Sequence, residues 1–233
     1  MTEQLIMLIG AAGSGKTTSA YAICKYFNFS HRSFAAPIKA IASSIGFTDY
    51  QLLIDKNQIN DKYKISAREF LQKFGTEICR TSLSSILPTI GDNFWLNIME
   101  QEIMKNDRIV ICDGRFQNEA DLINKYKGII IKIERPNHIS ITGSNEQKHS
   151  SETEYNKIVP HYTIINDSDE DILTKKILDI VSNKIYNKDF TKNKQNTNCY
   201  IPKDISLNYK FIIGTIYILS AFIFYKLYMS TFD

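Results

Sequence analysis

The sequence predicts a doubly wound α/β fold, in which a parallel sheet of about five strands carries helices on both faces. Three observations support this fold class. Short apolar runs alternate along the chain with longer helical patterns. The apolar runs are continuous and rich in β-branched residues, which is typical of strands buried on both faces. A glycine-rich loop also separates the first apolar run from the first helical pattern.

The expected strands and helices follow from these patterns in chain order. Strands are expected at 5–9, 109–112, 129–133 and 162–165, with a less regular fifth segment at 31–34. Helices are expected at 16–27, 66–83, 94–104, 119–126 and 170–184. Residues 1–184 are therefore expected to form one α/β domain, large enough to bury a substantial core.

The C-terminal part of the chain differs in composition from this domain. Residues 185–210 are polar and rich in Asn and Lys, which predicts a linker. Residues 211–229 are almost entirely apolar and would span about 28 Å as a helix, close to the hydrocarbon thickness of a bilayer. We expect a hydrophobic C-terminal helix that anchors the chain in a membrane, and the lysines before it place the body in the cytosol. The alternatives are a buried terminal helix or an oligomer contact, which leaves a homodimer open.

Charge and cysteine usage exclude several classes of function. The formal net charge is +3, and the seven lysines and three aspartates from Lys184 onward give the tail +4, so the domain before it carries −1. Nothing in that domain indicates a nucleic-acid partner. The four scattered cysteines form no C-x-x-C pair. Their spacing argues against a disulfide framework or a zinc site and favours a reducing, cytoplasmic compartment.

A phosphate-binding loop links the first strand to the first helix. The run from Gly10 to Thr17 fits G-x-x-x-x-G-K-[ST], in which backbone N–H groups surround phosphate oxygens at a helix N-terminus. Lys16 supplies a cation for the β- and γ-phosphates, and the Thr17 hydroxyl suits Mg²⁺. The loop predicts a nucleoside triphosphate, taken as ATP with Mg²⁺, without identifying the acceptor. The residues expected to bind ATP are Gly10, Ala12, Gly13, Ser14, Gly15, Lys16, Thr17 and Thr18.

The helix expected at 66–83 has two chemically different faces. At about 100° per residue, the apolar side carries Ala67, Phe70, Leu71, Phe74 and Ile78, and the other side carries Arg68, Gln72, Gly75 and Thr76. The apolar side is expected to pack in the core. The guanidinium of Arg68 suits a monophosphate, and the Gln72 amide suits a base edge. The alternative is an ordinary solvated polar face.

Two further groups of residues are expected at the carboxyl edge of the sheet. Asp113 ends an apolar run and can hold Mg²⁺ through water, although capping a helix is the alternative. Arg115 would lie in the same cleft and neutralise phosphoryl charge. Asn118 and Glu119 open the next helix, where they either contact the nucleotide or cap the helix.

Other candidates lie nearer the acceptor and in a lid. Lys39 follows Pro37 in a segment expected over the acceptor site, with a surface lysine as the alternative. Trp95 is expected to pack in the core or the wall of the site rather than stack on a base. A polar loop from about residue 134 to 152 is expected to close over ATP and exclude water. The polar tips of this lid are Arg135, Lys148 and His149, and the catalytic cations are expected to be Lys16, Arg115 and Arg135.

Four short motifs carry a family resemblance. Segments 33–39, 68–80, 113–119 and 149–152 match F-A-x-P-[LI]-K, R-x-x-L-Q-x-x-G-T-E-x-x-R, D-x-R-F-x-N-E and H-x-S-E, in that order. With the phosphate loop, they make residues 1–182 resemble phage-type deoxynucleoside monophosphate kinases. One departure is Ala36, where the family commonly has Asp, so any contact of that carboxylate is missing or replaced.

The resemblance implies a P-loop nucleoside monophosphate kinase fold with a lid. It also implies transfer of the ATP γ-phosphate to a (deoxy)nucleoside monophosphate. Two alternatives remain: a kinase of a non-nucleotide phosphate such as phosphomevalonate, and a non-catalytic, membrane-tethered nucleotide-binding protein. The implied substrate-binding residues are Phe34, Lys39, Arg68, Gln72, Thr76, Trp95, Arg115, Asn118, Glu119, Lys148, His149 and Glu152.

Overall fold

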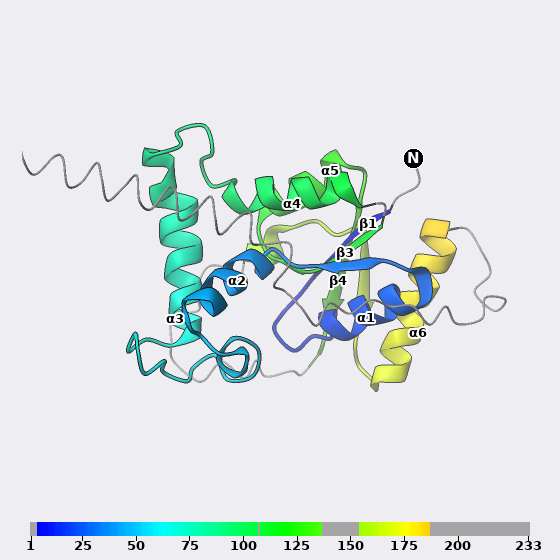
Figure 1. Cartoon of the computed structure of the whole chain (residues 1–233). Helices are drawn as coiled ribbons and strands as arrows, with labels where there is room; N and C mark the ends of the chain where they lie inside the picture. Colours follow the sequence, from blue (N-terminus) through cyan, green and yellow to red (C-terminus); the bar gives the residue numbers. More distant parts are fainter. Residues whose placement is uncertain (1–3, 107, 137–153, 187–233) are drawn as a thin grey trace, which may run out of the picture. The chain divides into compact units, whose positions relative to one another are not determined.

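A computed structural model describes residues 4–106, 108–136 and 154–186 (Figure 1). Most of the predicted lid, with Lys148, His149 and Glu152, lies outside the described residues, as do the predicted anchor at 211–229 and nearly all of the linker. In the described part of the chain, no helix is both long enough and apolar enough to cross a bilayer.

The chain divides into two compact units, each of which is described by itself. The sheet unit contains the described residues up to Phe34 and from Leu87 to Tyr186. The helical unit contains residues 35–86. The helical unit is thus an insertion in the sequence of the sheet unit, because the chain leaves the sheet unit once and later returns to it.

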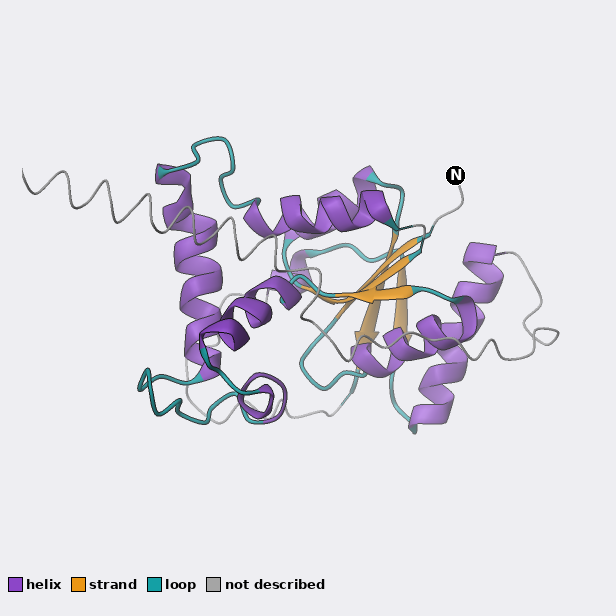
Figure 2. Ribbon diagram, viewed as in Figure 1, coloured by secondary structure: helices purple, strands orange, loops and turns teal. Residues whose placement is uncertain are grey.

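The sheet unit contains a five-stranded parallel sheet, as the sequence predicts (Figure 2). Its strands are β1 (Leu5–Ile9), β2 (Ser30–Arg32), β3 (Ile109–Gly114), β4 (Ile129–Glu134) and β5 (Tyr162–Ile165), in the spatial order β2-β3-β1-β4-β5. Every neighbouring pair runs parallel. The central strand β1 is buried along its whole length, which explains why its sequence is a continuous apolar run.

Helices cover both faces of this sheet (Figure 2). They are α1 (Lys16–Phe27), α4 (Phe94–Lys105), α5 (Gln117–Lys125) and α6 (Glu170–Ile180), and α6 continues in wider π-type turns over Val181–Tyr186. A short 3₁₀ turn, Glu154–Lys157, precedes β5. Helices α1 and α6 contact each other over one face, while α4 packs on α5 and α5 lies against β1 and β4 on the other. The prediction of a doubly wound sheet is therefore confirmed.

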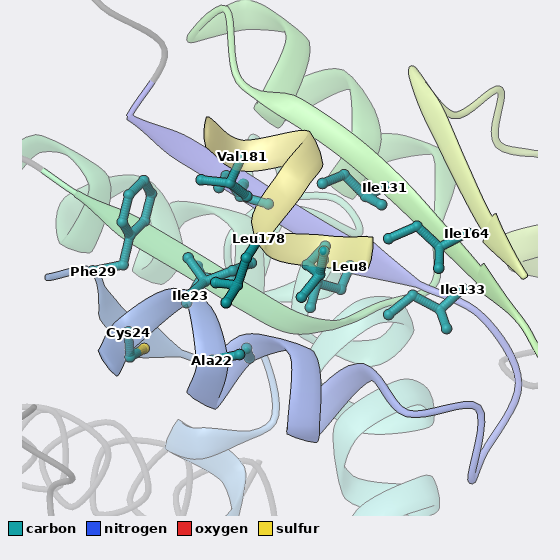
Figure 3. Packing of buried hydrophobic residues seen from close by; sticks show 14 of the residues in the cluster. Leu8, Ala22, Ile23, Cys24, Phe29, Ile131, Ile133, Ile164, Leu178 and Val181 are labelled. Carbon is teal, nitrogen blue, oxygen red and sulfur yellow. The ribbon is translucent and has the colours of Figure 1, made fainter. Parts of the chain in front are cut away.

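The core between the sheet and the α1–α6 layer is aliphatic. Figure 3 shows Leu8, Ile131 and Ile133 of the strands packed against Ile23 of α1 and Leu178 of α6. These side chains are at most 5 % exposed. Burial of each contributes about 1.5–3 kcal/mol. This layer fixes the carboxyl ends of β1, β4 and β5, where the loops of the site begin.

The helical unit has a smaller core. Its elements are α2 (Ala36–Ile45), a π-type turn (Tyr50–Ile54), α3 (Ala67–Gln72), wider π-type turns (Lys73–Thr81) and a 3₁₀ turn (Ser82–Ser85). The Ser66 hydroxyl caps α3 by accepting a hydrogen bond from Glu69 N at 3.1 Å. The buried residues of its core are Ala42, Phe47, Leu52 and Ala67.

The structure corrects the predicted helix at 66–83. Regular α-turns end at Gln72, and the wider turns that follow change the angle between successive side chains. As a result, Ile78 is 47 % exposed, although a 100° spacing places it on the apolar side. Gly75, expected to face a ligand, is buried instead, and a Cβ there would lie 2.9 Å from Ile38 Cδ1.

Two more differences concern the segment after the first helix. β2 ends at Arg32 rather than at Phe34, because the Phe34 N–H donates to the side chain of Asp113 instead of extending the strand ladder. Helix α2 was not expected at all. Pro37 lies in its first turn, where the missing proline N–H costs no helical hydrogen bond.

Candidate active site

The phosphate loop lies between β1 and α1 and depends on glycine at two positions. Gly10 and Gly15 have φ angles of 143° and 107°, which L side chains rarely adopt. Both glycines also lie close to other segments of the protein. A Cβ on Gly10 would lie 2.3 Å from the Ile133 carbonyl oxygen, and one on Gly15 would lie 2.5 Å from Leu173 Cδ2. The loop is therefore packed tightly against β4 and α6.

Side-chain donors bind several carbonyl oxygens of this loop. Lys16 Nζ donates to the oxygens of Gly10 at 2.8 Å and Ala11 at 2.6 Å. Arg135 Nη1 donates to the Gly13 oxygen at 3.4 Å. Asn166 Nδ2 donates to the Ser14 oxygen at 2.8 Å. These bonds pair four loop carbonyl oxygens within the protein, while phosphate would be bound by the loop N–H groups.

Lys16 lies in an environment that disfavours its charge. Burial, and next the nearby Arg115 guanidinium, lower the pKa of Lys16 to about 8, while Cys112 and Asp113 act in the opposite direction. A triphosphate beside Lys16 would restore the preference for the ammonium form. Arg115 and Asp113 thus both act on the charge of Lys16, and their joint role at a phosphate site stays a prediction.

Asp113 joins the carboxyl ends of β2 and β3. Its Oδ2 accepts from the Ser33 hydroxyl at 2.6 Å, and its Oδ1 accepts from the backbone N–H of Phe34 at 3.0 Å. These bonds are made to the end of a strand rather than to a helix. With the Thr17 hydroxyl, the carboxylate offers the oxygen donors that Mg²⁺ prefers. These two residues therefore fit the metal, and the assignment stays a prediction.

Glu119 and Asn118 were predicted either to cap α5 or to contact the nucleotide. Glu119 is buried, and its Oε2 accepts from the backbone N–H groups of Arg115 at 2.7 Å and Phe116 at 3.1 Å. It therefore stabilises the start of α5. Asn118 Nδ2 donates to Asp92 Oδ2 at 3.1 Å. A contact of either residue with the nucleotide stays a prediction.

A cavity of about 390 Å³ adjoins the phosphate loop. One side consists of loop and α1 residues, Arg135 lies at the end of β4, and the remaining side comes from the segment between β5 and α6. The segment between β5 and α6 carries no local sequence motif, so its residues were not predicted to line the site. The one indication in the sequence is that β5 is a parallel strand, because the carboxyl ends of parallel strands lie at the same edge of a sheet. The lining residues are Gly13, Gly15, Lys16, Thr17, Thr18, Arg135, Asn166, Ser168, Asp169, Glu170 and Leu173.

The remaining candidates are distributed over both units. In the helical unit, the half-buried Arg68 donates from Nε to Asn57 Oδ1 at 2.8 Å, and Lys39, Gln72 and Thr76 are also half-buried. In the sheet unit, Phe34 is buried.

Trp95 lies in the interior of the sheet unit. Its side chain is only 5 % exposed, and its ring meets that of Phe94 edge-on with centroids 4.7 Å apart. This placement agrees with the expected packing role, and a contact of Trp95 with the substrate stays a prediction.

Comparisons with known proteins identify relatives of the chain. A family model described as deoxynucleotide monophosphate kinase matches residues 42–177. A protein of Acanthamoeba polyphaga mimivirus, provisionally named as a deoxynucleotide monophosphate kinase, is 31 % identical over 191 residues. The match covers 77 % of this chain and 96 % of the mimivirus protein.

Solved structures give weaker matches. The shikimate kinase of Aquifex aeolicus aligns with a TM-score of 0.44 at 14 % identity, covering 75 % of this chain and 94 % of that kinase. A gluconokinase of Sinorhizobium meliloti 1021 has the same TM-score at 13 % identity, covering 80 % and 95 %. Both scores are below 0.5, and the strand order of the sheet unit stands independently of them.

Proposed function

Because the chain belongs to the deoxynucleotide monophosphate kinase family, we propose that its sheet unit binds ATP and Mg²⁺ and that its helical unit binds the acceptor. The enzyme is a phosphotransferase that moves the ATP γ-phosphate to a deoxynucleoside monophosphate. Its products are ADP and a deoxynucleoside diphosphate. The observation that best supports ATP binding is the glycine loop, followed directly by Lys16 and adjoining a cavity of about 390 Å³.

Phosphoryl transfer needs positioning and charge neutralisation more than a dedicated base. An oxygen of the acceptor monophosphate forms the new bond to the γ-phosphorus, and the bond from that phosphorus to the β–γ bridging oxygen breaks. Lys16, Arg115 and Arg135 supply the cations that balance the charge on the transferred group. Mg²⁺ held by Thr17 and Asp113 would add positive charge beside the β- and γ-phosphates.

For the acceptor, we assign Arg68 to the monophosphate and Gln72 to the base. A guanidinium pairs with two phosphate oxygens at once, and a carboxamide can both donate to and accept from a base edge. Lys39 and Thr76 would add further polar contacts. Support comes from the match of segment 68–80 to the family motif and from the half-buried state of these side chains, which leaves part of each accessible.

The experiment that tests this function is a panel of acceptors with ATP–Mg²⁺. We expect diphosphate formation with one or more deoxynucleoside monophosphates, and matched ribonucleotides in the same panel measure sugar discrimination. Phosphomevalonate serves as the non-nucleotide acceptor. Turnover of phosphomevalonate without turnover of any nucleotide would reject the acceptor assignment, and ATP binding without any transfer would favour a non-catalytic nucleotide-binding protein.

A separate proposal concerns the C-terminal segment at 211–229, which we assign as a membrane anchor with the kinase body on the cytoplasmic side. Its support is the apolar composition and the lysines that precede it. Removal of residues 205–233 should release an active kinase from the membrane fraction. A full-length protein found entirely in the soluble fraction would reject the anchor. The solution mass of the truncated protein reports whether a homodimer forms without the anchor.

A further inference from the structure

Asn166 has a buried amide side chain that donates a hydrogen bond to the phosphate loop, although the two are far apart in the sequence. It directly follows β5 and is only 7 % exposed. Its Nδ2 donates to the Ser14 oxygen at 2.8 Å, and its backbone N–H donates to the Glu134 oxygen at 2.7 Å. The side chain is thus held between the end of β4 and the loop, and it belongs to no part of the phosphate-binding motif.

The Asn166 amide also lies close to Gly15 of the loop. A Cβ on Gly15 would lie 2.9 Å from Asn166 Nδ2 and 2.5 Å from Leu173 Cδ2. The loop therefore approaches the β5–α6 segment as closely as a glycine permits. A side chain at position 15 would displace the Asn166 amide, so this contact depends on the glycine.

The contact determines the direction of one N–H group in the loop. The Ser14 carbonyl and the Gly15 N–H belong to the same planar trans peptide and point in opposite directions. Because Asn166 binds the carbonyl, the N–H of Gly15 is turned away from Asn166. Backbone N–H groups at this part of a phosphate loop are those that receive phosphate oxygens.

We infer that Asn166 is a positioning residue of the donor site, which orients the Ser14–Gly15 peptide so that the Gly15 N–H faces the triphosphate. This inference rests on the proposed role of the sheet unit in ATP binding. Without the bond, the peptide is free to rotate, and each productive binding event must first restore its orientation. The loss should therefore affect ATP and leave the affinity for the acceptor unchanged.

The test compares two buried asparagines whose amides each donate to a backbone carbonyl. Asn166→Asp keeps the shape and removes the donor. Asn60→Asp is the matched control, because Asn60 is 5 % exposed and donates to the Gly46 oxygen at 3.1 Å in the helical unit. ATP affinity is measured by calorimetry, kcat and KM by turnover, and thermal stability by circular dichroism. Asn166→Ser removes the donor without adding a negative charge beside the cavity, so the serine variant decides between lost positioning and charge repulsion.

We expect both aspartate variants to lose thermal stability. Only the Asn166 variants should bind ATP more weakly, by about 10-fold to 100-fold, as expected for loss of one oriented donor to a charged group. In the wild type, the Gly15 amide resonance should shift on ATP addition, and that shift should shrink in Asn166→Ser.

ATP affinity within about twofold of wild type in the Asn166 variants, despite reduced stability, would overturn the inference, because a purely structural role predicts that result. Calorimetry reports on ATP alone. A wild-type protein that binds ATP but phosphorylates no nucleotide would reject the proposed acceptor while leaving the Asn166 test intact.

Discussion

The sheet unit and the helical unit, to which we assign the donor and the acceptor, differ in how they hold their candidate residues. In the sheet unit, the phosphate loop is held by a buried parallel sheet and by side chains that bind its carbonyl oxygens. In the helical unit, the core is small, the long helix changes from α-turns to wider turns, and the candidate residues are half-buried. A triphosphate is bound largely by backbone N–H groups, so its site needs a rigid frame. A site that binds its acceptor through long side chains needs a less rigid backbone.

The largest effect is expected from loss of the donor cation. Lys16→Ala should lower kcat by about 10³-fold or more, because it removes a positive charge beside the transferred phosphoryl group. Circular dichroism should show an intact fold. Lys25→Ala removes an exposed lysine from the same helix and serves as the control. Unchanged turnover in the Lys16 variant would show that the donor phosphates bind elsewhere.

A smaller effect, confined to the acceptor, is expected in the helical unit. Arg68→Ala should raise the acceptor KM by about 10-fold to 100-fold, the loss expected when a charge-assisted bond to a phosphate is removed. The KM for ATP should stay the same. Lys73→Ala is the matched control, because Lys73 is exposed and pairs with Glu69 on the same helix. If the acceptor KM of the Arg68 variant matched that of the control, the acceptor face would have been assigned to the wrong helix.

The charge of Lys16 predicts a pH dependence of ATP binding. Since the pKa of Lys16 in the free protein is lowered to about 8, the ammonium form is lost as the pH rises through that value. The dissociation constant for ATP should then rise, by up to about tenfold per pH unit above pH 8, because one proton must be taken up on binding. Calorimetry between pH 7 and 9.5 measures this slope. A Lys16→Arg variant keeps its charge, so its affinity should change less with pH.

The smallest effect separates the two roles considered for Glu119. Glu119→Ala should lower the free energy of unfolding by about 1–2 kcal/mol, because two backbone N–H groups at the start of α5 lose their acceptor. Thermal unfolding measures this loss, with Asp121→Ala as an exposed control on the same helix. A change in acceptor KM beyond that of the control would reveal a contact with the nucleotide in addition to the cap.

The sequence predicted the sheet unit closely, because its patterns are local. The strands at 5–9 and 162–165 and the helix at 16–27 begin and end where expected, since each apolar run is bounded by a turn or by the phosphate loop. The charge of Arg115 lowers the pKa of Lys16, so these two predicted cations influence each other, and their catalytic role stays a prediction.

The features that were missed depend on geometry that sequence periodicity does not encode. The wider turns over Lys73–Thr81 break the assumption of 100° per residue, so the positions of Gly75 and Ile78 were predicted wrongly. Asn166 and Ser14 are 152 residues apart in the sequence, and no local pattern indicates their contact. Helix α2 was also missed, although Pro37 in its first turn is a position that favours the start of a helix.

The insertion of the helical unit has a consequence for how this fold can diversify. Strand β2 precedes the insertion and pairs with β3 after it, so the sheet must close a long loop in order to fold. The free-energy cost of such closure grows only with the logarithm of loop length, by roughly 0.6 kcal/mol for each doubling. Segments of different length between Phe34 and Leu87 are therefore nearly equivalent for the stability of the sheet. One sheet framework can thus accommodate inserts of different length.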